Sequence, residues 1–69
     1  MNPQRLIAMA NDIAAFFNAE ADKEAAAEQV ANHLRKFWDP RMREAIRRIA
    51  ADGGTGMSAL ALNGVRRLQ

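Results

Sequence analysis

The sequence lacks the residues from which small proteins build crosslinks and metal sites. Its 69 residues include no cysteine, no tyrosine and only one histidine. A disulfide and a thiolate metal site are therefore excluded, and one histidine cannot form a zinc site even with carboxylate help. A chain this short usually needs a source of stability beyond its hydrophobic core. With disulfides and metal sites excluded, the remaining sources are a binding partner or close helix packing.

Proline and glycine are also scarce, and no long hydrophobic run is present. There are two prolines and four glycines, three of them within residues 53–56. Because alanine is abundant and β-branched residues are sparse, helix is expected throughout. No apolar stretch approaches the roughly 20 residues that cross a bilayer, and the first residues lack the pattern of a signal peptide. We therefore expect a soluble, cytoplasmic protein.

Capping residues divide the chain into helices. Each segment expected to be helical is preceded by a residue whose side chain can accept a hydrogen bond from a free backbone N–H, namely Asn2, Asp22, Asp39 and Ser58. Pro40 follows the third cap and pushes the residue before it out of the α region, so the second helix must end near Trp38. Gly53 and Gly54 are predicted to end the third. The prediction is an all-α protein, a small bundle of three helices plus a short C-terminal fourth helix, forming one domain over residues 1–69.

Apolar residues at spacings of three and four predict the faces that pack together. The predicted faces are Leu6, Met9, Ile13, Phe16 and Phe17; Ala26 or Ala27, Val30, Leu34, Phe37 and Trp38; Met42, Ala45, Ile46, Ile49 and Ala50; and Leu62, Val65 and Leu68, with Met57 placed as a hydrophobic staple. Such a short chain buries only about 60% of its unfolded surface. The predicted core is therefore small.

Residues 32–44, NHLRKFWDPRMRE, combine the only tryptophan and the only histidine with four lysine and arginine residues. Two interpretations of Trp38 remain open. It can fill the angle between two helices at the corner, or its ring can stay partly exposed and anchor a partner, because tryptophan and arginine are enriched at binding hot spots. The two are compatible when an indole buries one edge and presents the other.

Charge is polarised along the chain. Eight of the ten basic residues lie in residues 31–69, nearly all of them arginine, whereas five of the eight acidic residues lie in residues 1–30. Arginine binds carboxylates and phosphates with two parallel hydrogen bonds. A single arginine is readily explained as part of a solvated helix face, but the set predicts a docking surface for a negatively charged partner.

No pattern typical of catalysis is present. His33 has no second histidine, cysteine or acid partner in a fixed motif, and no nucleophile–base arrangement can be recognised. The sequence GGTG at 53–56 has neither the preceding strand nor the following lysine of a phosphate loop, so a turn is predicted. We therefore expect that the chain is not an enzyme on its own.

The segment ANHLRKFWDPRMR at 31–43, with MNPQRLIAMANDIAAFF before it and GGTGMSAL after it, resembles the delta subunit of cytoplasmic, NAD-dependent, molybdenum-containing formate dehydrogenases. The resemblance covers nearly the whole chain. Its most specific part is asparagine-histidine, a basic pair, and then Phe37, Trp38, an acid, Pro40, Arg41 and Met42. The tail departs from it, because Asn63 and Gly64 stand where stronger helix formers are expected.

The resemblance implies an accessory subunit. In such enzymes the alpha subunit carries the molybdenum bis-pterin guanine dinucleotide and iron–sulfur clusters and oxidises formate to carbon dioxide, while the beta and gamma subunits pass electrons through FMN and further clusters to NAD. The delta subunit carries no cofactor and is expected to bind the alpha subunit and support assembly, maturation or stability of the complex. The partner-binding residues expected here are Arg35, Phe37, Trp38, Pro40, Arg41, Met42 and Arg43.

Two other functions are compatible with the sequence. A pI near 9.9 and an arginine-rich half are features of small nucleic-acid-binding modules. The acidic first half and a net charge of only +2 weigh against this alternative. Self-association of the helices is the third possibility.

Overall fold

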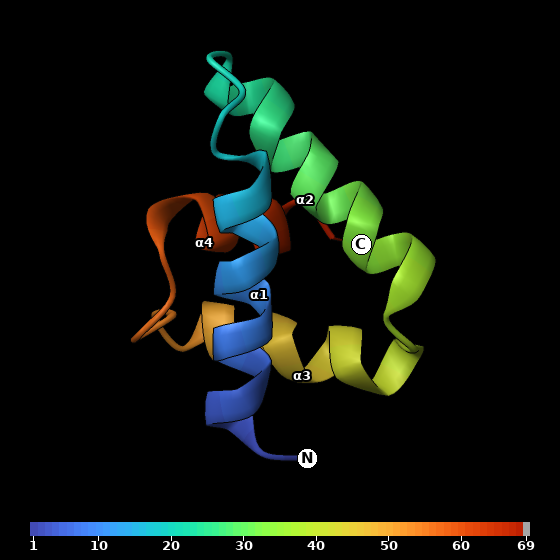
Figure 1. Ribbon diagram of the computed structural model, residues 1–69. Helices are drawn as coiled ribbons and strands as arrows, with labels where there is room; N and C mark the ends of the chain where they lie inside the picture. Colours follow the sequence, from blue (N-terminus) through green and yellow to red (C-terminus); the bar gives the residue numbers. More distant parts are fainter. Residues whose placement is uncertain (69) are drawn as a thin grey trace.

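The computed structural model describes residues 1–68, which form four helices and no strand (Figure 1). The helices are α1 (Pro3–Phe17), α2 (Lys23–Phe37), α3 (Pro40–Ala51) and α4 (Ala59–Arg66). The all-α prediction of three helices and a short fourth is confirmed. No helix in this part of the chain is both long and apolar enough to cross a membrane.

All four predicted N-caps are present. In each, a side-chain oxygen accepts a hydrogen bond from a backbone N–H two or three residues further on, at Asn2, Asp22, Asp39 and Ser58. Such a cap stabilises a helix by about 1 kcal/mol, because it satisfies an amide that has no partner within the helix. The helix starts are therefore fixed by local chemistry.

The end of α3 is closed by two glycines, as predicted. The N–H of Gly53 donates to the carbonyl of Ala50, and the N–H of Gly54 donates to the carbonyl of Ile49 at 2.9 Å. Both glycines have positive φ, 110° and 65°, which side chains disfavour. The chain reverses here and runs through the turn at 53–56 toward α4.

The helices pack around a core in which α4 contacts each of the other three helices. In Figure 1, α1 stands upright, α3 crosses near its lower end and α2 runs diagonally along one side. The largest fully buried side chains are Leu34, Ile46, Val30 and Val65. Alanines fill much of the remaining interior, and small residues of this kind let helices approach closely. The methionines at 9, 42 and 57 are half-buried against this core, as predicted.

Close packing against α2 explains why one of the two weak helix formers in the tail, Gly64, stands in α4. A Cβ on Gly64 would overlap Cγ1 of Val30 and lie 2.7 Å from Val30 Cβ and 3.3 Å from the Ala27 carbonyl oxygen. Glycine therefore lets α4 cross α2 with its backbone against the Val30 side chain. The intrinsic disadvantage of glycine in a helix, about 1 kcal/mol, is offset by this packing, and α4 forms despite it.

Asn11 fastens the loop before α4 to α1. Its amide Nδ2 donates to the Gly56 carbonyl at 2.9 Å, and its Oδ1 accepts from the Ser58 N–H at 2.8 Å. One side chain thus satisfies two backbone groups that lie more than 40 residues away in the sequence. This contact sets the position at which α4 begins.

Two phenylalanines were wrongly placed in the predicted apolar faces. Phe16 is 78% exposed and Phe37 is 71% exposed. Phe16 and Phe17 are neighbours, about 100° apart around a helix, so both cannot face the same core. On α2 the buried line runs Val30, Leu34 and Trp38 at a spacing of four, which turns Phe37 outward.

Candidate partner-binding surfaces

The corner, defined as residues 37–43 between α2 and α3, is held together from within the chain. Trp38 ends α2 and retains only 5% of its surface exposed, as the corner interpretation predicts. Asp39 caps α3, and its carboxylate accepts from the Met42 N–H at 3.0 Å. The indole is covered inside the subunit, and its part in partner binding stays a prediction.

Arg43, on α3, also stabilises the corner. Its Nη1 donates to the Trp38 carbonyl at 2.7 Å and to the Arg35 carbonyl at 3.2 Å. These carbonyls lie at the end of α2, where backbone acceptors have no partner within the helix and a positive charge is favoured. Arg43 thus joins α3 to the end of α2.

Arg35 and Arg67 connect the end of the described chain to α2. Arg35 pairs with Glu28 at 3.0 Å and donates to the Arg67 carbonyl at 2.9 Å. Arg67 pairs in turn with Glu24 at 2.6 Å and with Glu28 at 3.5 Å. Hydrogen bonding from Arg35 and the nearby positive charges lower the pKa of Glu28 below its ordinary value of 4.5. Acidic residues of the first half thus pair with arginines of the second.

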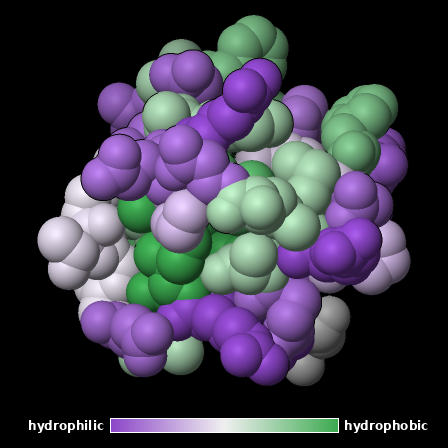
Figure 2. Space-filling model, turned by 90° about the horizontal axis from the view of Figure 1, so that it is seen from below, coloured by the Kyte–Doolittle hydropathy of each residue, from purple (hydrophilic) through white to green (hydrophobic). Residues whose placement is uncertain are grey.

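The other expected site residues are placed differently. Met42 is half-buried against the core, whereas Pro40 and Arg41 are exposed. Pro40 and Arg41, but not Met42, line a hollow of about 410 Å³ on the side of the molecule where α3 lies, together with Met1, Glu44, Ala45 and Arg48. Figure 2 shows hydrophobic side chains gathered on this side, bordered by hydrophilic ones. The structure therefore does not unite the seven expected residues in one exposed surface.

Aromatic side chains form a continuous line across α1 and α2. The ring centroids of Phe16 and Phe17 are 5.0 Å apart, those of Phe17 and His33 are 6.2 Å apart, and those of His33 and Phe37 are 4.7 Å apart. We call Phe16, Phe17, His33 and Phe37 the aromatic row. Hollows of about 300 and 220 Å³ flank it, both lined by Phe17 and His33. An exposed aromatic cluster of this kind is typical of a contact site.

The aromatic row was missed by the sequence analysis, although two signals pointed to it. The adjacent Phe16 and Phe17 require one ring to point away from the core, and His33 and Phe37 stand four residues apart on one helix face. The contact between the two helices, which joins the pairs into one row, has no local signal. His33 therefore packs against two phenylalanines, and no group of three potential metal ligands occurs among residues 1–68.

Together these features define a class of protein: a small all-α chain with two exposed phenylalanines and many arginines on its surface, and with no buried polar or charged residue among those described. Comparison with protein families matches residues 5–65 to the family described as the NADH-dependent formate dehydrogenase delta subunit, FdsD. The chain belongs to this family, and so it is a delta subunit, part of an NAD-dependent formate dehydrogenase complex. No curated protein and no solved structure matches it.

Proposed function

We propose that this delta subunit binds the molybdenum-containing alpha subunit and supports assembly, maturation or stability of the complex, without catalysing a step itself. The cofactors then reside in the partner subunits: molybdenum bis-pterin guanine dinucleotide, iron–sulfur clusters, FMN and NAD. The beta and gamma subunits complete the complex, which works in the cytoplasm. The proposal follows from membership of the family together with the surface chemistry described above.

The observation that carries the proposal is the exposure of the aromatic row. Phe16 and Phe37 place two large apolar rings in water on a chain whose whole surface measures only 4426 Å². Covering such rings releases ordered water and stabilises a complex by roughly 1.5–3 kcal/mol per ring. A partner that covers the row would therefore gain most of its binding energy there, with polar groups at the border.

The corner continues this surface. Phe37 belongs to both the row and the corner, and Pro40 and Arg41 follow it within four residues. We propose that Phe37 is the anchor, that Arg41 pairs with a carboxylate of the alpha subunit, and that Arg35 and Arg43 present their remaining N–H groups at the border. Trp38 and Met42 would act from beneath, by holding the corner in shape.

Binding of nucleic acid has less support. Four of the arginines, Arg35, Arg47, Arg48 and Arg67, are paired with glutamates. Partial neutralisation of this kind weakens attraction to phosphates, which depends on free positive charge. An aromatic row beside the corner also fits a protein partner better than a duplex backbone.

The proposal is tested by replacing the two exposed rings. Phe16→Ser and Phe37→Ser together should weaken binding to a formate dehydrogenase complex purified without its delta subunit by at least about tenfold, because hot-spot side chains contribute about 2 kcal/mol or more. Affinity would be measured by calorimetry, and the yield of assembled active enzyme should fall in parallel. Gln4→Ala, at the other end of α1, is the matched control. Unchanged affinity of the double variant would remove the aromatic row from the interface.

A further inference from the structure

A carboxylate lies at the α1 end of the aromatic row. Asp12 stands four residues before Phe16, so the two side chains lie on the same face of α1, one turn apart. With Ile13, Phe17 and His33 they line the larger of the two hollows that flank the row, about 300 Å³ in volume. Asp12 and Phe16 are exposed and the other three residues are only partly buried, so the hollow still offers apolar surface to a partner.

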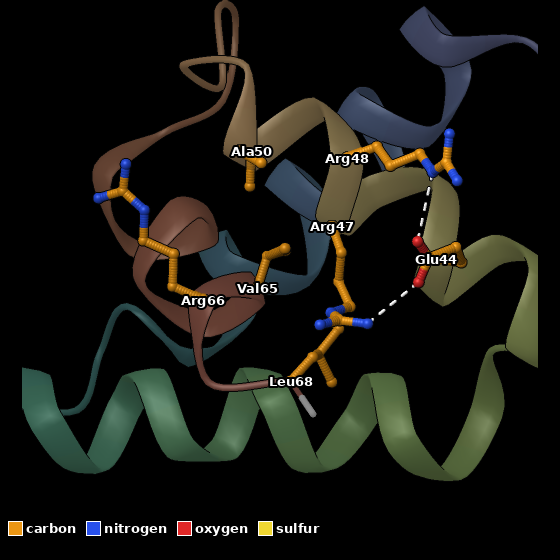
Figure 3. Close-up of a pocket in the computed structure, with 8 residues that line it drawn as sticks. Glu44, Arg47, Arg48, Ala50, Val65, Arg66 and Leu68 are labelled. Atoms are coloured by element: carbon orange, nitrogen blue, oxygen red, sulfur yellow. Dashed lines mark hydrogen bonds and ion pairs between the residues drawn. The ribbon is translucent and has the colours of Figure 1, made fainter.

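Asp12 has no counter-charge within the described chain. It makes no ion pair with any residue among 1–68. Figure 3 shows the opposite case on α3, where the carboxylate of Glu44 is shared by Arg47 at 3.0 Å and Arg48 at 3.3 Å. The Asp12 carboxylate therefore remains available to a cation from outside the subunit.

The two ends of the aromatic row carry opposite charges. Lys36 lines the other hollow, beside Phe37, together with the amide side chains of Gln29 and Asn32. Lys36 also makes no ion pair in the part of the chain that the structure describes. A cationic group of a partner is thus attracted to the Asp12 end of the row and repelled from the Lys36 end.

A partner that covers Phe16 must also cover Asp12, because the two side chains are one helical turn apart. An ionised carboxylate that loses its water without gaining a counter-charge costs several kcal/mol, about as much as the covered ring contributes. The surface that covers this end of the row therefore has to supply a cation.

The shape and lining of the hollow favour arginine as that cation. A guanidinium group binds a carboxylate with two parallel hydrogen bonds, and its flat face stacks on aromatic rings. The Phe16 ring is largely exposed and meets Phe17 edge to face, with their planes at 87°, so it is open to such stacking. An aliphatic side chain would leave Asp12 unpaired, and a lysine lacks the planar group.

We propose that an arginine of the alpha subunit occupies this hollow, paired with Asp12 and stacked on Phe16. The inference rests on the proposed function, because it takes the alpha subunit as the partner that covers the row. It adds the chemical identity of the contacting group and the orientation of the partner: its cationic group lies over α1, away from Lys36.

Two conservative substitutions and their combination test this contact. The dissociation constant of the full-length subunit would be measured with the formate dehydrogenase complex purified without its delta subunit. Asp12→Asn should raise it about fivefold and Phe16→Leu about threefold, because the first removes the charge and the second the ring. The double variant should weaken binding by less than the product of the two factors, since both side chains contact one arginine. A strict product would mean separate contacts and overturn the proposal.

The control is Asp52→Asn, the same change at another exposed carboxylate without an ion pair among residues 1–68. It should alter the dissociation constant less than about twofold, since exposed charges outside a contact contribute little. Equal weakening by Asp12→Asn and Asp52→Asn would show general attraction between charges and overturn the proposal. So would a dimer of the free subunit, seen by light scattering, that Asp12→Asn abolishes, because the arginine would then belong to a second copy.

Failure of this contact and failure of the proposed function give different results. If the unaltered subunit does not bind the delta-free complex, the proposed function is wrong, and the arginine contact falls with it. If the unaltered subunit binds and Phe16→Leu weakens binding, but Asp12→Asn leaves the dissociation constant unchanged, only the arginine contact is wrong.

Discussion

Phe37 and Trp38 are neighbours in the sequence, yet they illustrate two opposite uses of an aromatic ring. Trp38 is 5% exposed and closes the corner from within, whereas Phe37 is 71% exposed and continues the aromatic row. The rotation of about 100° between successive helical residues is enough to separate them. The larger ring stabilises the fold, whereas the smaller one stays exposed to water.

The basic side chains divide in the same way. Arg43 donates to two carbonyls at the end of α2, while Arg41, two residues earlier, is exposed and makes no ion pair with any residue of the described chain. The corner thus alternates between groups that hold the subunit together and groups that face outward. Richness in aromatic and basic residues alone does not identify an interface, because the same residue types serve both purposes.

Replacement of Trp38 should give the largest effect. Trp38→Ala is expected to lower the free energy of unfolding by about 3–5 kcal/mol, because it leaves a cavity at the corner. Urea unfolding followed by circular dichroism would measure this change. Phe37→Ala should change the same quantity by less than about 0.5 kcal/mol, as expected for an exposed position. Equal losses of stability would contradict the distinction between the two rings.

A smaller effect is expected at the arginines of α3. Arg43→Met should lower the free energy of unfolding by about 1–2 kcal/mol, because the Trp38 carbonyl loses a charged donor in a partly buried place. Arg41→Met makes the same chemical change where no described partner is lost, and it should leave stability nearly unaltered. Thermal unfolding of the two variants would compare their stabilities. A larger loss of stability in Arg41→Met than in Arg43→Met would contradict the distinction between the two arginines.

The smallest effect concerns pH. Because the folded-state pKa of Glu28 is lowered from 4.5, its ion pairs stabilise the fold fully above that pH and lose their contribution as pH falls through the lowered value. The difference in unfolding free energy between the unaltered chain and Glu28→Gln should therefore shrink as the pH falls below 4.5 and disappear once the pH is below the lowered pKa. Urea titrations of both chains over this range would show it. A difference that grows as the pH falls would reverse the assigned sign.

The parts of the fold that depend on neighbouring residues were predictable from the sequence. The caps at Asn2, Asp22, Asp39 and Ser58 and the glycine turn after α3 require only residues a few positions apart. The role of Gly64 within α4 was not predictable, because the lack of a side chain is favourable only where the helix packs against Val30, which lies on another helix. Asn11 is similar, since its two backbone partners are distant in the sequence.

The candidate site was predicted less well, for the same reason. Sequence reasoning singled out residues 35–43 as rich in groups able to bind a partner, and their part in binding stays a prediction. It could not foresee that Arg35 and Arg43 donate to backbone carbonyls, or that the contact between Phe17 and His33 joins the aromatic side chains of α1 and α2 into one row. Orientation of a side chain around its helix depends on which neighbour the helix meets, and this is a property of the whole fold.

The most direct test of the central claim is photochemical crosslinking from position 37 within the assembled complex. Phe37 would be replaced by a benzophenone amino acid, which keeps an aromatic ring in place and reacts only with groups in contact. We predict crosslinks to the alpha subunit, with position 4 carrying the same group as the control that gives none. Crosslinks only to another subunit, or none from position 37, would contradict the proposal that the aromatic row binds the alpha subunit.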